Sequence, residues 1–493
     1  MSDSLYRGML KTTSLLSGSK AITIVVSILR NKTLALILGP SGIGFLGILT
    51  ASIELARVVF SFGLDAATVR NIAQNHTDQL AINRLYRISQ RVAILLGLVS
   101  AAIFGIISPY LSNHFFGDPS KFWCFLIGAS SLLLTPLLSV QLAFLQGIKQ
   151  PKALAICQIV ASIASSILNI ILTIAYGING AIFSIFVFTL SSFLIHRIFV
   201  NRFLIFEHSA LPKFFSAFKS LIFLGSAFAI NGIWLTLSNW LNISFLKDYF
   251  GVESAALQIG LFSAASMLGN FYINILISAM SADFYPQLIS IANDKLKVRE
   301  LFNHQTRLCM AIGVPVSTAM IIASPWLLQV LYSREFVEAK DVMRLILFGM
   351  TIRFISCPIG FSLFACGTPR SVAFSEICMG ATMISFSWIM IGKFGLIGVG
   401  LGLICANLLY LIGVGFAMKK KGVYWSPRTL KIVVWTILVM GLGVFVSLKG
   451  SWLLSQGLSI IILIPLIIMH IIIMKKDANV DLIQFLNFFR FRK

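Results

Sequence analysis

Long apolar runs constrain this chain more than any other feature of its sequence. The stretches 396–418 and 460–474 contain no Asp, Glu, Lys or Arg, and their apolar residues do not alternate with polar ones. Strands of a membrane barrel would alternate over about ten positions. By contrast, an apolar helix of about twenty residues crosses the ~30 Å hydrocarbon core with its backbone groups bonded internally. The runs therefore predict an all-α membrane protein.

The composition agrees with this reading and leads to a count of spans. Hydrophobic residues make up 58% of the 493 residues and charged residues only 11%, whereas soluble domains carry about 25% charged residues. Lipid must therefore solvate most of the surface. Apolar runs between polar breaks predict about fourteen transmembrane helices. The expected spans are 13–38, 44–70, 91–111, 122–146, 153–176, 178–200, 219–246, 254–281, 307–332, 342–366, 371–391, 395–418, 430–448 and 452–474.

The positive charge indicates how these spans are oriented. Of the 39 Lys and Arg residues, 27 lie on one set of alternate connections, which includes both termini, and 7 lie on the other set. Short cytoplasmic loops carry the excess of Lys and Arg, so we expect an inner-membrane protein with both termini in the cytoplasm. The net charge of +22 would also suit a nucleic-acid partner. The alternation favours topology instead, and we expect no nucleic acid.

A weak internal repeat predicts two homologous halves. The turn at Gly147 is matched at Gly367, an offset of 220 positions. The motif Tyr-Gly-Ile-Asn-Gly at Gly177 is matched by Phe-Gly-Leu-Ile-Gly at Gly395, an offset of 218 positions. Halves with an even number of helices share one orientation, so their axis runs along the membrane normal.

A fainter match links Leu-Gly-Pro at 38–40 to Phe-Gly-Val at 250–252, at an offset of about 212. A coincidence of Gly and Pro in turns is the alternative explanation for all three matches. The expected parts are an N-terminal six-helix lobe (1–205), a C-terminal six-helix lobe (206–420), and two extra helices with an amphipathic tail (421–493).

Polar residues inside the first two spans follow helical spacing and predict a shared aqueous cavity. A charge at the bilayer centre costs at least ~2.5–3.5 kcal/mol, so these residues are functional candidates. Spacings of three, four and seven place the members of each span on one helix face. They are Thr13, Ser17, Lys20, Ser27 and Asn31 in the first span, and Glu54, Arg57, Ser61, Asp65 and Thr68 in the second.

The cavity is expected to contain Lys20, Glu54, Arg57 and Asp65. Arg30 and Lys32 are expected nearer its rim. The structural alternative is that Glu54 and Arg57 pair three residues apart and only hold helices together. In the second half, the intramembrane candidates are Arg353 and Glu376.

Signals of other chemistry do not occur in the sequence. There is no Gly-x-x-x-x-Gly-Lys-Ser/Thr phosphate loop, so no nucleotide site would drive transport. The six His residues show no metal-ligand spacing, and no nucleophile or acid/base set lies in a long periplasmic loop. We therefore expect no catalytic residues, no metal and no cofactor, and a protein that is not an enzyme.

Three motifs carry a family resemblance. They are Arg30-Asn-Lys-Thr-Leu-Ala-Leu-Ile-Leu-Gly-Pro-Ser-Gly-Ile-Gly-Phe, Leu145-Gln-Gly with Pro151-Lys, and Ser281-Ala-Asp-Phe-Tyr-Pro-Gln-Leu-Ile. In this order and spacing, over residues 5–420, the chain resembles O-antigen and polysaccharide flippases. These belong to the multidrug/oligosaccharidyl-lipid/polysaccharide exporter superfamily. Their common form has twelve spans, so the last two spans of this chain depart from that form.

The resemblance implies two six-helix lobes around a central cavity with alternating access. The implied substrate is an undecaprenyl-pyrophosphate-linked oligosaccharide, moved from the cytoplasmic to the periplasmic leaflet. Membrane lipid, a polysaccharide polymerase and a chain-length regulator are the implied partners. An anionic headgroup needs a cationic cavity, so the substrate-binding candidates are Lys20, Arg30, Arg57 and Arg353. The ion-coupling candidates are Glu54, Asp65 and Glu376.

Two other functions stay open on the sequence. One is a drug or other-lipid exporter of the same superfamily, although export of organic cations would favour an acidic cavity. The other is an inner-membrane polysaccharide polymerase or ligase, although the periplasmic loops are short for such an enzyme. Coupling to a proton or Na⁺ gradient is expected from the intramembrane carboxylates. The alternative is downhill transport drawn by periplasmic polymerisation.

The charge distribution makes one direct prediction about orientation. In a cysteine-free background, single cysteines at Asn293 and Asn113 should react oppositely with a membrane-impermeant thiol reagent applied to intact cells. Position 113 should be labelled from the periplasm, and position 293 only after permeabilisation. Labelling of position 293 in intact cells would overturn the topology.

Overall fold

The structure is a computed structural model that describes residues 2–75, 78–204, 214–292, 294–448 and 452–478. Within these ranges the regular elements are α-helices and two short 3-10 helices, with no strand. The all-α expectation is therefore confirmed. The predicted amphipathic tail at 480–493 lies outside the described residues.

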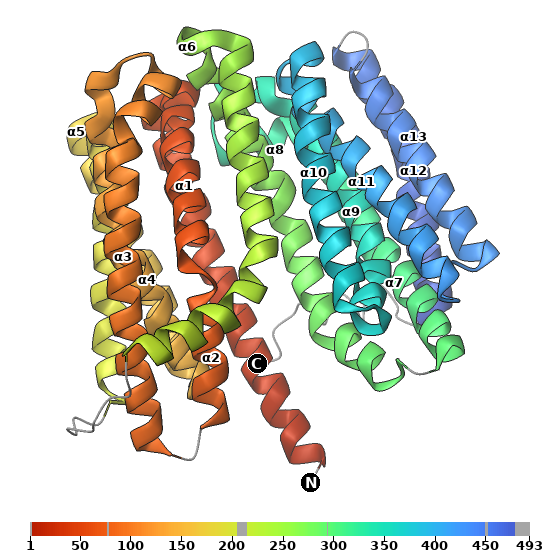
Figure 1. Cartoon of the computed structure of the whole chain (residues 1–493). Helices are drawn as coiled ribbons and strands as arrows, with labels where there is room; N and C mark the ends of the chain where they lie inside the picture. The colour runs from red at the N-terminus through yellow and green to blue at the C-terminus, as the bar shows by residue number, and fades with distance from the viewer. Residues whose placement is uncertain (1, 76–77, 205–213, 293, 449–451, 479–493) are drawn as a thin grey trace. The chain divides into compact units, whose positions relative to one another are not determined.

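The helices follow one another with short connections (Figure 1). Their bounds are α1 (Ser2–Ser61), α2 (Leu64–Gln74), α3 (Gln79–Phe116), η1 (Pro119–Lys121), α4 (Phe122–Gly147), α5 (Pro151–Asn201), α6 (Phe214–Ser290), α7 (Lys295–Ile322), α8 (Ser324–Leu331), η2 (Arg334–Ala339), α9 (Lys340–Cys366), α10 (Pro369–Phe394), α11 (Leu396–Lys420), α12 (Pro427–Leu448) and α13 (Trp452–Ala478).

Glycines with positive φ break three of the long helices into two arms each. They are Gly39 in α1, Gly177 in α5 and Gly251 in α6, with φ of 63°, 57° and 72°. Side chains rarely tolerate this region of φ, so glycine is needed at the break. In α5 the chain reverses there. Asn169 Nδ2 lies 2.6 Å from Ser184 Oγ, fifteen residues on, although a straight helix would separate them by about 22 Å.

The number of crossing segments agrees with the sequence. Ten helices are long and apolar enough to cross a membrane. Three of these are the helices that a glycine breaks into two arms, and α13 adds the shorter apolar stretch Gly457–Ile473. This gives fourteen segments, and the protein is a multi-pass membrane protein.

Two predicted spans differ from the structure in their extent. The second was expected to run to residue 70, but α1 ends at Ser61 because Phe62 and Gly63 both have positive φ. The ninth was expected as one span over 307–332, but it divides at Ala323 into α7 and α8. Pro325 lies at the second position of α8, where its missing N–H costs no helical hydrogen bond.

Matched backbone conformations support the internal repeat. Gly177 has φ 57° and ψ −135°, and Gly395 has φ 57° and ψ −131°. Gly39 has φ 63° and ψ −175°, and Gly251 has φ 72° and ψ 171°. Each pair is the one expected from the sequence offsets, so the same turn recurs in each half. The division into parts at residues 205 and 420 stays a prediction.

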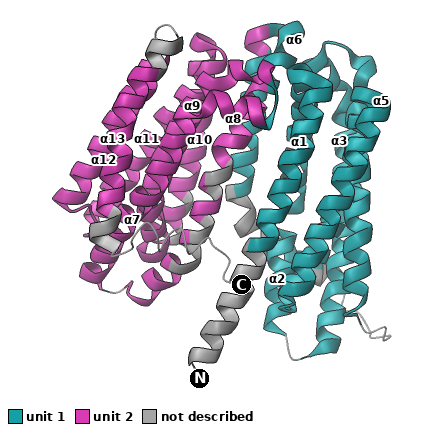
Figure 2. Ribbon diagram, turned by 180° about the vertical axis from the view of Figure 1, so that it is seen from behind, with its two compact units in different colours: residues 1–247, 251–260, 331–333 teal, residues 248–250, 261–330, 334–493 magenta. Residues whose placement is uncertain are grey.

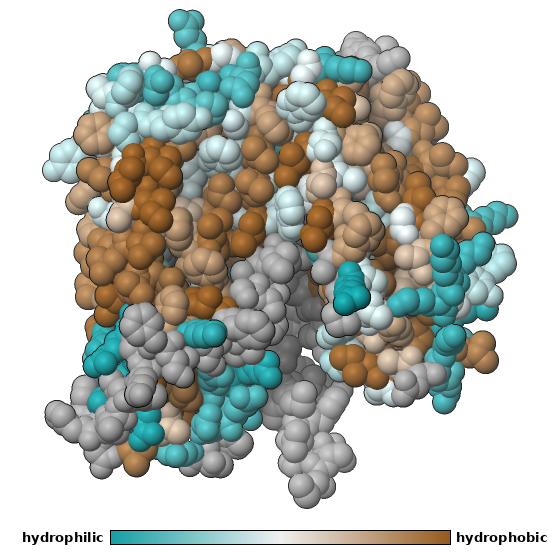
Figure 3. All heavy atoms as spheres, viewed as in Figure 1, coloured by the Kyte–Doolittle hydropathy of each residue, from teal (hydrophilic) through white to brown (hydrophobic). Residues whose placement is uncertain are grey.

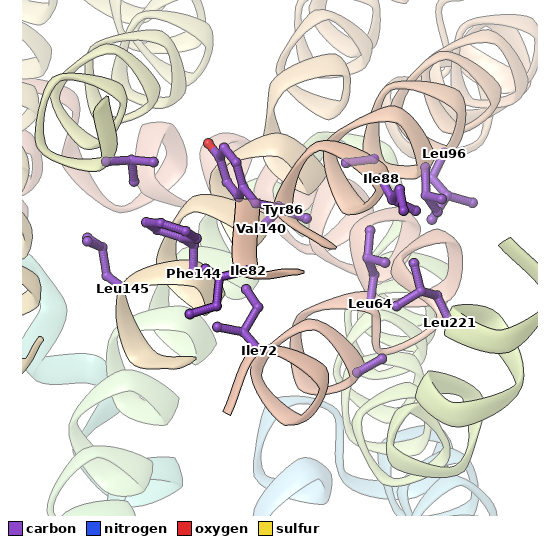
Figure 4. Packing of buried hydrophobic residues seen from close by; sticks show 14 of the residues in the cluster. Leu64, Ile72, Ile82, Tyr86, Ile88, Leu96, Val140, Phe144, Leu145 and Leu221 are labelled. Atoms are coloured by element: carbon purple, nitrogen blue, oxygen red, sulfur yellow. The ribbon is translucent and has the colours of Figure 1, made fainter. Parts of the chain in front are cut away.

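The chain forms two compact units, which Figure 2 colours separately. Unit 1 comprises residues 1–247, 251–260 and 331–333, and unit 2 comprises residues 248–250, 261–330 and 334–493. The core of unit 1 contains residues of α2, α3, α4 and α5 together with Leu221 of α6. In this core the Tyr86 ring lies against Phe144, with ring centroids 4.7 Å apart (Figure 4).

The surface of unit 1 carries the pattern of a lipid-facing protein. On its helices at the left of Figure 3, hydrophobic side chains cover the middle of the helices, and hydrophilic side chains gather toward both ends. Exposed apolar side chains such as Ile106, Ile174 and Leu194 are 79%, 66% and 51% exposed. In water such a surface would drive aggregation, whereas in a bilayer it is the solvated surface.

In unit 2 the buried side chain of Arg344 connects α8 and α12 to α9. Arg344 was counted from the sequence among the charges of the sparsely charged side. It is instead only 1% exposed, within α9. Its guanidinium donates to Ser324 Oγ, Asp341 Oδ1 and the Ser447 carbonyl oxygen at 3.0, 3.0 and 3.1 Å. The partners satisfy the charge inside the protein and tie α8 and α12 to α9.

Candidate functional site

Arg57 and Glu54 form an ion pair on the second arm of α1. Arg57 Nε donates to Glu54 Oε2 at 2.7 Å, and Nη2 donates to Oε1 at 2.6 Å. The paired arrangement uses the planar guanidinium as a fork. The two side chains remain 34% and 47% exposed. The pairing three residues apart, which the sequence offered as the structural alternative to a cavity, is therefore present, on a helix surface rather than in a core.

The polar face expected to continue from this pair is interrupted. Asp65 and Thr68 lie on α2, beyond the break at Phe62 and Gly63. Asp65 is exposed and still acts electrostatically on Arg57. Thr68 is fully buried and donates to Ser89 Oγ of α3 at 3.1 Å. The interpretation of 54–68 as one helix face is therefore wrong, because two separate helices carry its residues.

Arg30 has partners different from those of Arg57. Its Nε and Nη2 both donate to Asn31 Oδ1 at 3.2 Å, and its guanidinium carbon lies 5.3 Å from the centre of the Phe188 ring of α5. Tyr332, which follows α8, is 5% exposed. Burial raises the pKa of the Tyr332 hydroxyl, and the Arg30 guanidinium nearby opposes that rise. Arg30 therefore lies in an aromatic setting within unit 1.

The two lysines of the predicted cavity lie on the same arm of α1 as Arg30. Lys20 is exposed, and Lys32 is half-buried. No ion pair between either lysine and a carboxylate appears among the contacts of the described residues. Their part in a shared cavity with Glu54 stays a prediction.

In unit 2, Arg353 and Glu376 lie in one cluster. The Arg353 guanidinium carbon lies 5.0 Å from the centre of the Tyr410 ring of α11. Glu376 of α10 is near enough to act electrostatically on Arg353, Cys357 and Tyr410. Arg353 Nη1 is buried and has no hydrogen-bond partner among the described residues. A buried N–H donor of a charged group is costly to leave unpaired, so this atom is suited to receive an anion.

The structure thus bonds Glu54 to Arg57, and it places Glu376 near enough to Arg353 to act on it electrostatically. Sequence spacing offered the Glu54–Arg57 pair as an alternative, since both residues share one helix. It did not predict that Glu376 neighbours Arg353, because these residues come from different helices. Tyr410 was also missed, because a single aromatic residue within an apolar run gives no signal.

The described residues contain no candidate metal centre. Among them, no group of three or more His, Cys, Asp or Glu side chains is arranged to hold a metal ion. The chemistry available is therefore that of arginine, carboxylate and aromatic groups inside apolar helices. These groups can bind and release an anion, and they can exchange a proton.

Fourteen crossing segments in repeated halves, with arginine and carboxylate groups inside them, define a multi-spanning membrane protein. The model of the family described as polysaccharide biosynthesis protein matches residues 33–341. This match covers more than half of the chain, so the protein belongs to that family.

Solved structures share the fold. A structure of the lipid II flippase MurJ in an inward closed conformation matches with a TM-score of 0.69 and 16% identity, over 94% of this chain and all of that one. An inward-facing multidrug resistance MATE family transporter of the MOP superfamily matches with a TM-score of 0.64 and 14% identity, over 81% of this chain and 94% of that one. At this identity the likeness establishes the fold alone.

A curated relative matches part of the chain. The capsular polysaccharide biosynthesis protein CapF of Staphylococcus aureus is 22% identical over 210 residues, or 41% of this chain. The chain spans half the length of that relative.

The two arginine–carboxylate clusters should respond differently to substitution. Arg353→Ala should lower the unfolding temperature of the detergent-purified protein, because the half-buried Glu376 loses the cation that acts on it electrostatically. Arg353→Ala with Glu376→Gln should lower it by clearly less than the sum of the single changes. The matched cycle of Arg57→Ala and Glu54→Gln should be nearly additive, because half-exposed pairs contribute only about 0–1 kcal/mol. Additive behaviour at Arg353 and Glu376 would contradict the cluster.

Proposed function

We propose that this protein is a flippase for an undecaprenyl-pyrophosphate-linked oligosaccharide. It would carry the headgroup from the cytoplasmic to the periplasmic leaflet by alternating access. The observation that carries the proposal is the location of Arg57 and Arg353 within membrane-crossing helices of a chain from a polysaccharide biosynthesis family. Charged side chains at such depth raise the free energy of the folded protein, and binding of an anionic substrate would explain why they are present.

The chemistry of the substrate fits these groups. A pyrophosphate carries several negative charges and forms paired hydrogen bonds with a planar guanidinium. The Arg57–Glu54 pair is half exposed and so only weakly held. A pyrophosphate can therefore displace the Glu54 carboxylate. Arg353 presents a buried Nη1 with no partner among the described residues, which a phosphate oxygen would satisfy. Lys20 and Arg30 would add positive charge along α1.

The carboxylates supply a mechanism for coupling. Glu54 is hydrogen-bonded to Arg57, and Glu376 interacts electrostatically with Arg353; both arginines would bind substrate. Protonation of the carboxylate would free the arginine for the substrate, and ionisation would return the arginine to its partner and release the substrate. Asp65, near Arg57, would act in the same way. If Glu54→Gln and removal of the proton and Na⁺ gradients leave the transport rate of reconstituted protein unchanged, the carboxylates serve only to neutralise their neighbours.

The remaining parts of the proposal follow from the same role. The protein would bind and move its substrate without breaking a bond, and so would not be an enzyme. It would lie in the inner membrane with both termini in the cytoplasm, where O-antigen and related repeat units are completed on the lipid. A polymerase and a chain-length regulator would act on the product. The alternative is an exporter of drugs or other lipids with the same fold, and the cationic groups favour an anionic cargo over a cationic one.

Substitution of the arginines tests the proposal in cells. Arg57→Ala together with Arg353→Ala should abolish surface polysaccharide and cause the lipid-linked repeat unit to accumulate, while the protein level stays unchanged. Arg57→Lys should lose much of the activity as well, because an ammonium group cannot form the paired contact.

Arg334→Ala, which removes an exposed arginine of η2, is the matched control and should retain normal polysaccharide. Normal polysaccharide from a well-expressed double variant would refute the binding role of Arg57 and Arg353.

A further inference from the structure

The connection between α11 and α12 is fastened to the start of α7 in unit 2. Asn303 Nδ2 of α7 donates to the Tyr424 carbonyl oxygen at 3.0 Å, and Asn303 Oδ1 accepts from the Ser426 backbone N–H at 2.7 Å. The rings of Phe302 and Trp425 stack with their centroids 6.0 Å apart. The connection is therefore held by specific contacts, and the groups that it presents have defined positions.

Two basic side chains of α7 lie against this connection. The guanidinium carbon of Arg299 is 3.7 Å from the centre of the Tyr424 ring. A Cβ added to Gly422 would lie 3.6 Å from Lys295 Cδ, so the Lys295 side chain passes beside the turn. Lys295 and Arg299 are four residues apart and share one face of α7. A guanidinium stacked on an aromatic ring keeps N–H groups at its edge, where they can bind an anion.

Positive charge is in excess around the connection. Residues 294–307 and 419–431 contain nine Lys and Arg residues but only two acidic residues. One of the two, Asp294, accepts from the backbone N–H groups of Leu296 and Lys297 and pairs with the Lys297 ammonium at 3.4 Å. Four basic side chains form no ion pair in the described part of the chain, namely Lys295, Arg299, Lys419 and Lys420. This excess charge suits an anion from outside the chain.

Exposed apolar and aromatic side chains lie among these charges. Leu296, between two lysines, is 72% exposed, and Leu430 of α12 is 45% exposed. Tyr424 is 38% exposed. Basic residues beside exposed apolar ones are typical of the boundary between lipid headgroups and acyl chains, and Tyr and Trp are enriched at the same depth. This mixture favours a lipid partner over an acidic soluble protein.

The ends of the crossing helices place the same groups at a membrane surface. α7 begins at Lys295, α11 ends at Lys420 and α12 begins at Pro427, and all three helices are long and apolar enough to cross a membrane. At the lower right of Figure 3, hydrophilic side chains of unit 2 lie beside hydrophobic ones. The charge distribution predicts that this end of unit 2 faces the cytoplasm.

We propose that Lys295, Arg299, Lys419, Lys420 and Tyr424 form a basic surface that binds the phosphate headgroups of anionic phospholipids in the cytoplasmic leaflet. The headgroup phosphate binds the edge of the Arg299 guanidinium and the lysine ammonium groups, and the acyl chains lie along the exposed leucines on either side. Lipids whose headgroups have no net charge bind less well, because their own cation competes for the phosphate. This inference goes beyond transport and does not depend on the identity of the substrate.

An orientation signal is the competing explanation, because Lys and Arg in cytoplasmic connections fix topology without binding any particular lipid. The two explanations differ in selectivity and in location. An orientation signal needs no preference for an anionic headgroup, and a general effect of positive charge would be the same at any exposed basic connection on that side. A defined site gives a preference that depends on these residues and not on others.

The first experiment counts lipids bound to the full-length protein. The detergent-purified protein is titrated with phosphatidylglycerol or with phosphatidylcholine, and bound lipid is measured by native mass spectrometry. The wild-type protein should bind phosphatidylglycerol at a several-fold lower concentration than phosphatidylcholine. The difference should disappear in the surface variant, which carries Lys295→Gln, Arg299→Gln, Lys419→Gln and Lys420→Gln.

A matched control removes the same charge from exposed positions of unit 1 on the side predicted to be cytoplasmic. It carries Arg70→Gln, Arg84→Gln, Arg91→Gln and Lys152→Gln, and it should keep the wild-type preference. Equal binding of the two lipids by the wild-type protein would overturn the proposal. An equal loss of preference in both variants would overturn it as well, because net charge alone would then decide binding.

A second measurement leaves the basic surface intact and does not depend on the folding of the surface variant. Leu296→Cys in a cysteine-free background is labelled with bimane and reconstituted in phosphatidylcholine that contains a small fraction of nitroxide-labelled lipid. Nitroxide-labelled phosphatidylglycerol should quench the bimane several-fold more than the same fraction of nitroxide-labelled phosphatidylcholine, because the anionic lipid gathers beside Leu296. Leu80→Cys at the start of α3 is the control, since Leu80 is 44% exposed, and there the two lipids should quench alike. Equal quenching at position 296 would overturn the proposal.

Discussion

The hydrocarbon interior of the bilayer solvates neither a backbone amide nor a charge, and the structure depends on this constraint. It forces the crossing segments to be helices, because only a helix bonds its own backbone throughout. It also leaves each intramembrane charge in need of a partner. Arg57 has Glu54, Arg353 has Tyr410 and Glu376 nearby, and Arg344 has two side chains and a carbonyl oxygen. The same constraint that fixes the fold therefore arranges the groups that would bind an anion.

Turns with glycine at positive φ let one long helix supply two crossings. Gly39, Gly177, Gly251 and Gly395 adopt closely matched conformations in pairs, and the pairs follow the offsets of the internal repeat. Because the first hairpins of the two repeats meet at Gly44 and Ala256, the repeat is also a device that brings equivalent helices into contact. The hairpins and their internal symmetry thus depend on a few glycine positions.

Apolar run length and charge alternation predicted the helices well, because both depend on whether a segment lies in lipid or in water. They predicted less about contacts between helices. The break after Ser61 was missed, since Phe62 carries no signal for positive φ. Arg344 was assigned to the aqueous side, because its partners Ser324 and Ser447 come from other helices. The proximity of Glu376 to Arg353 was missed for the same reason. Periodicity identifies a helix face, and only packing decides what that face meets.

The central claim is that this protein moves an anionic lipid-linked oligosaccharide across a bilayer. The most direct measurement is the appearance of the oligosaccharide headgroup in the opposite leaflet of vesicles that contain the purified protein and no other. The account predicts translocation without ATP, at a rate well above that of protein-free vesicles and of vesicles with the Arg57→Ala and Arg353→Ala double variant. Translocation by wild-type vesicles no faster than by protein-free vesicles would contradict it.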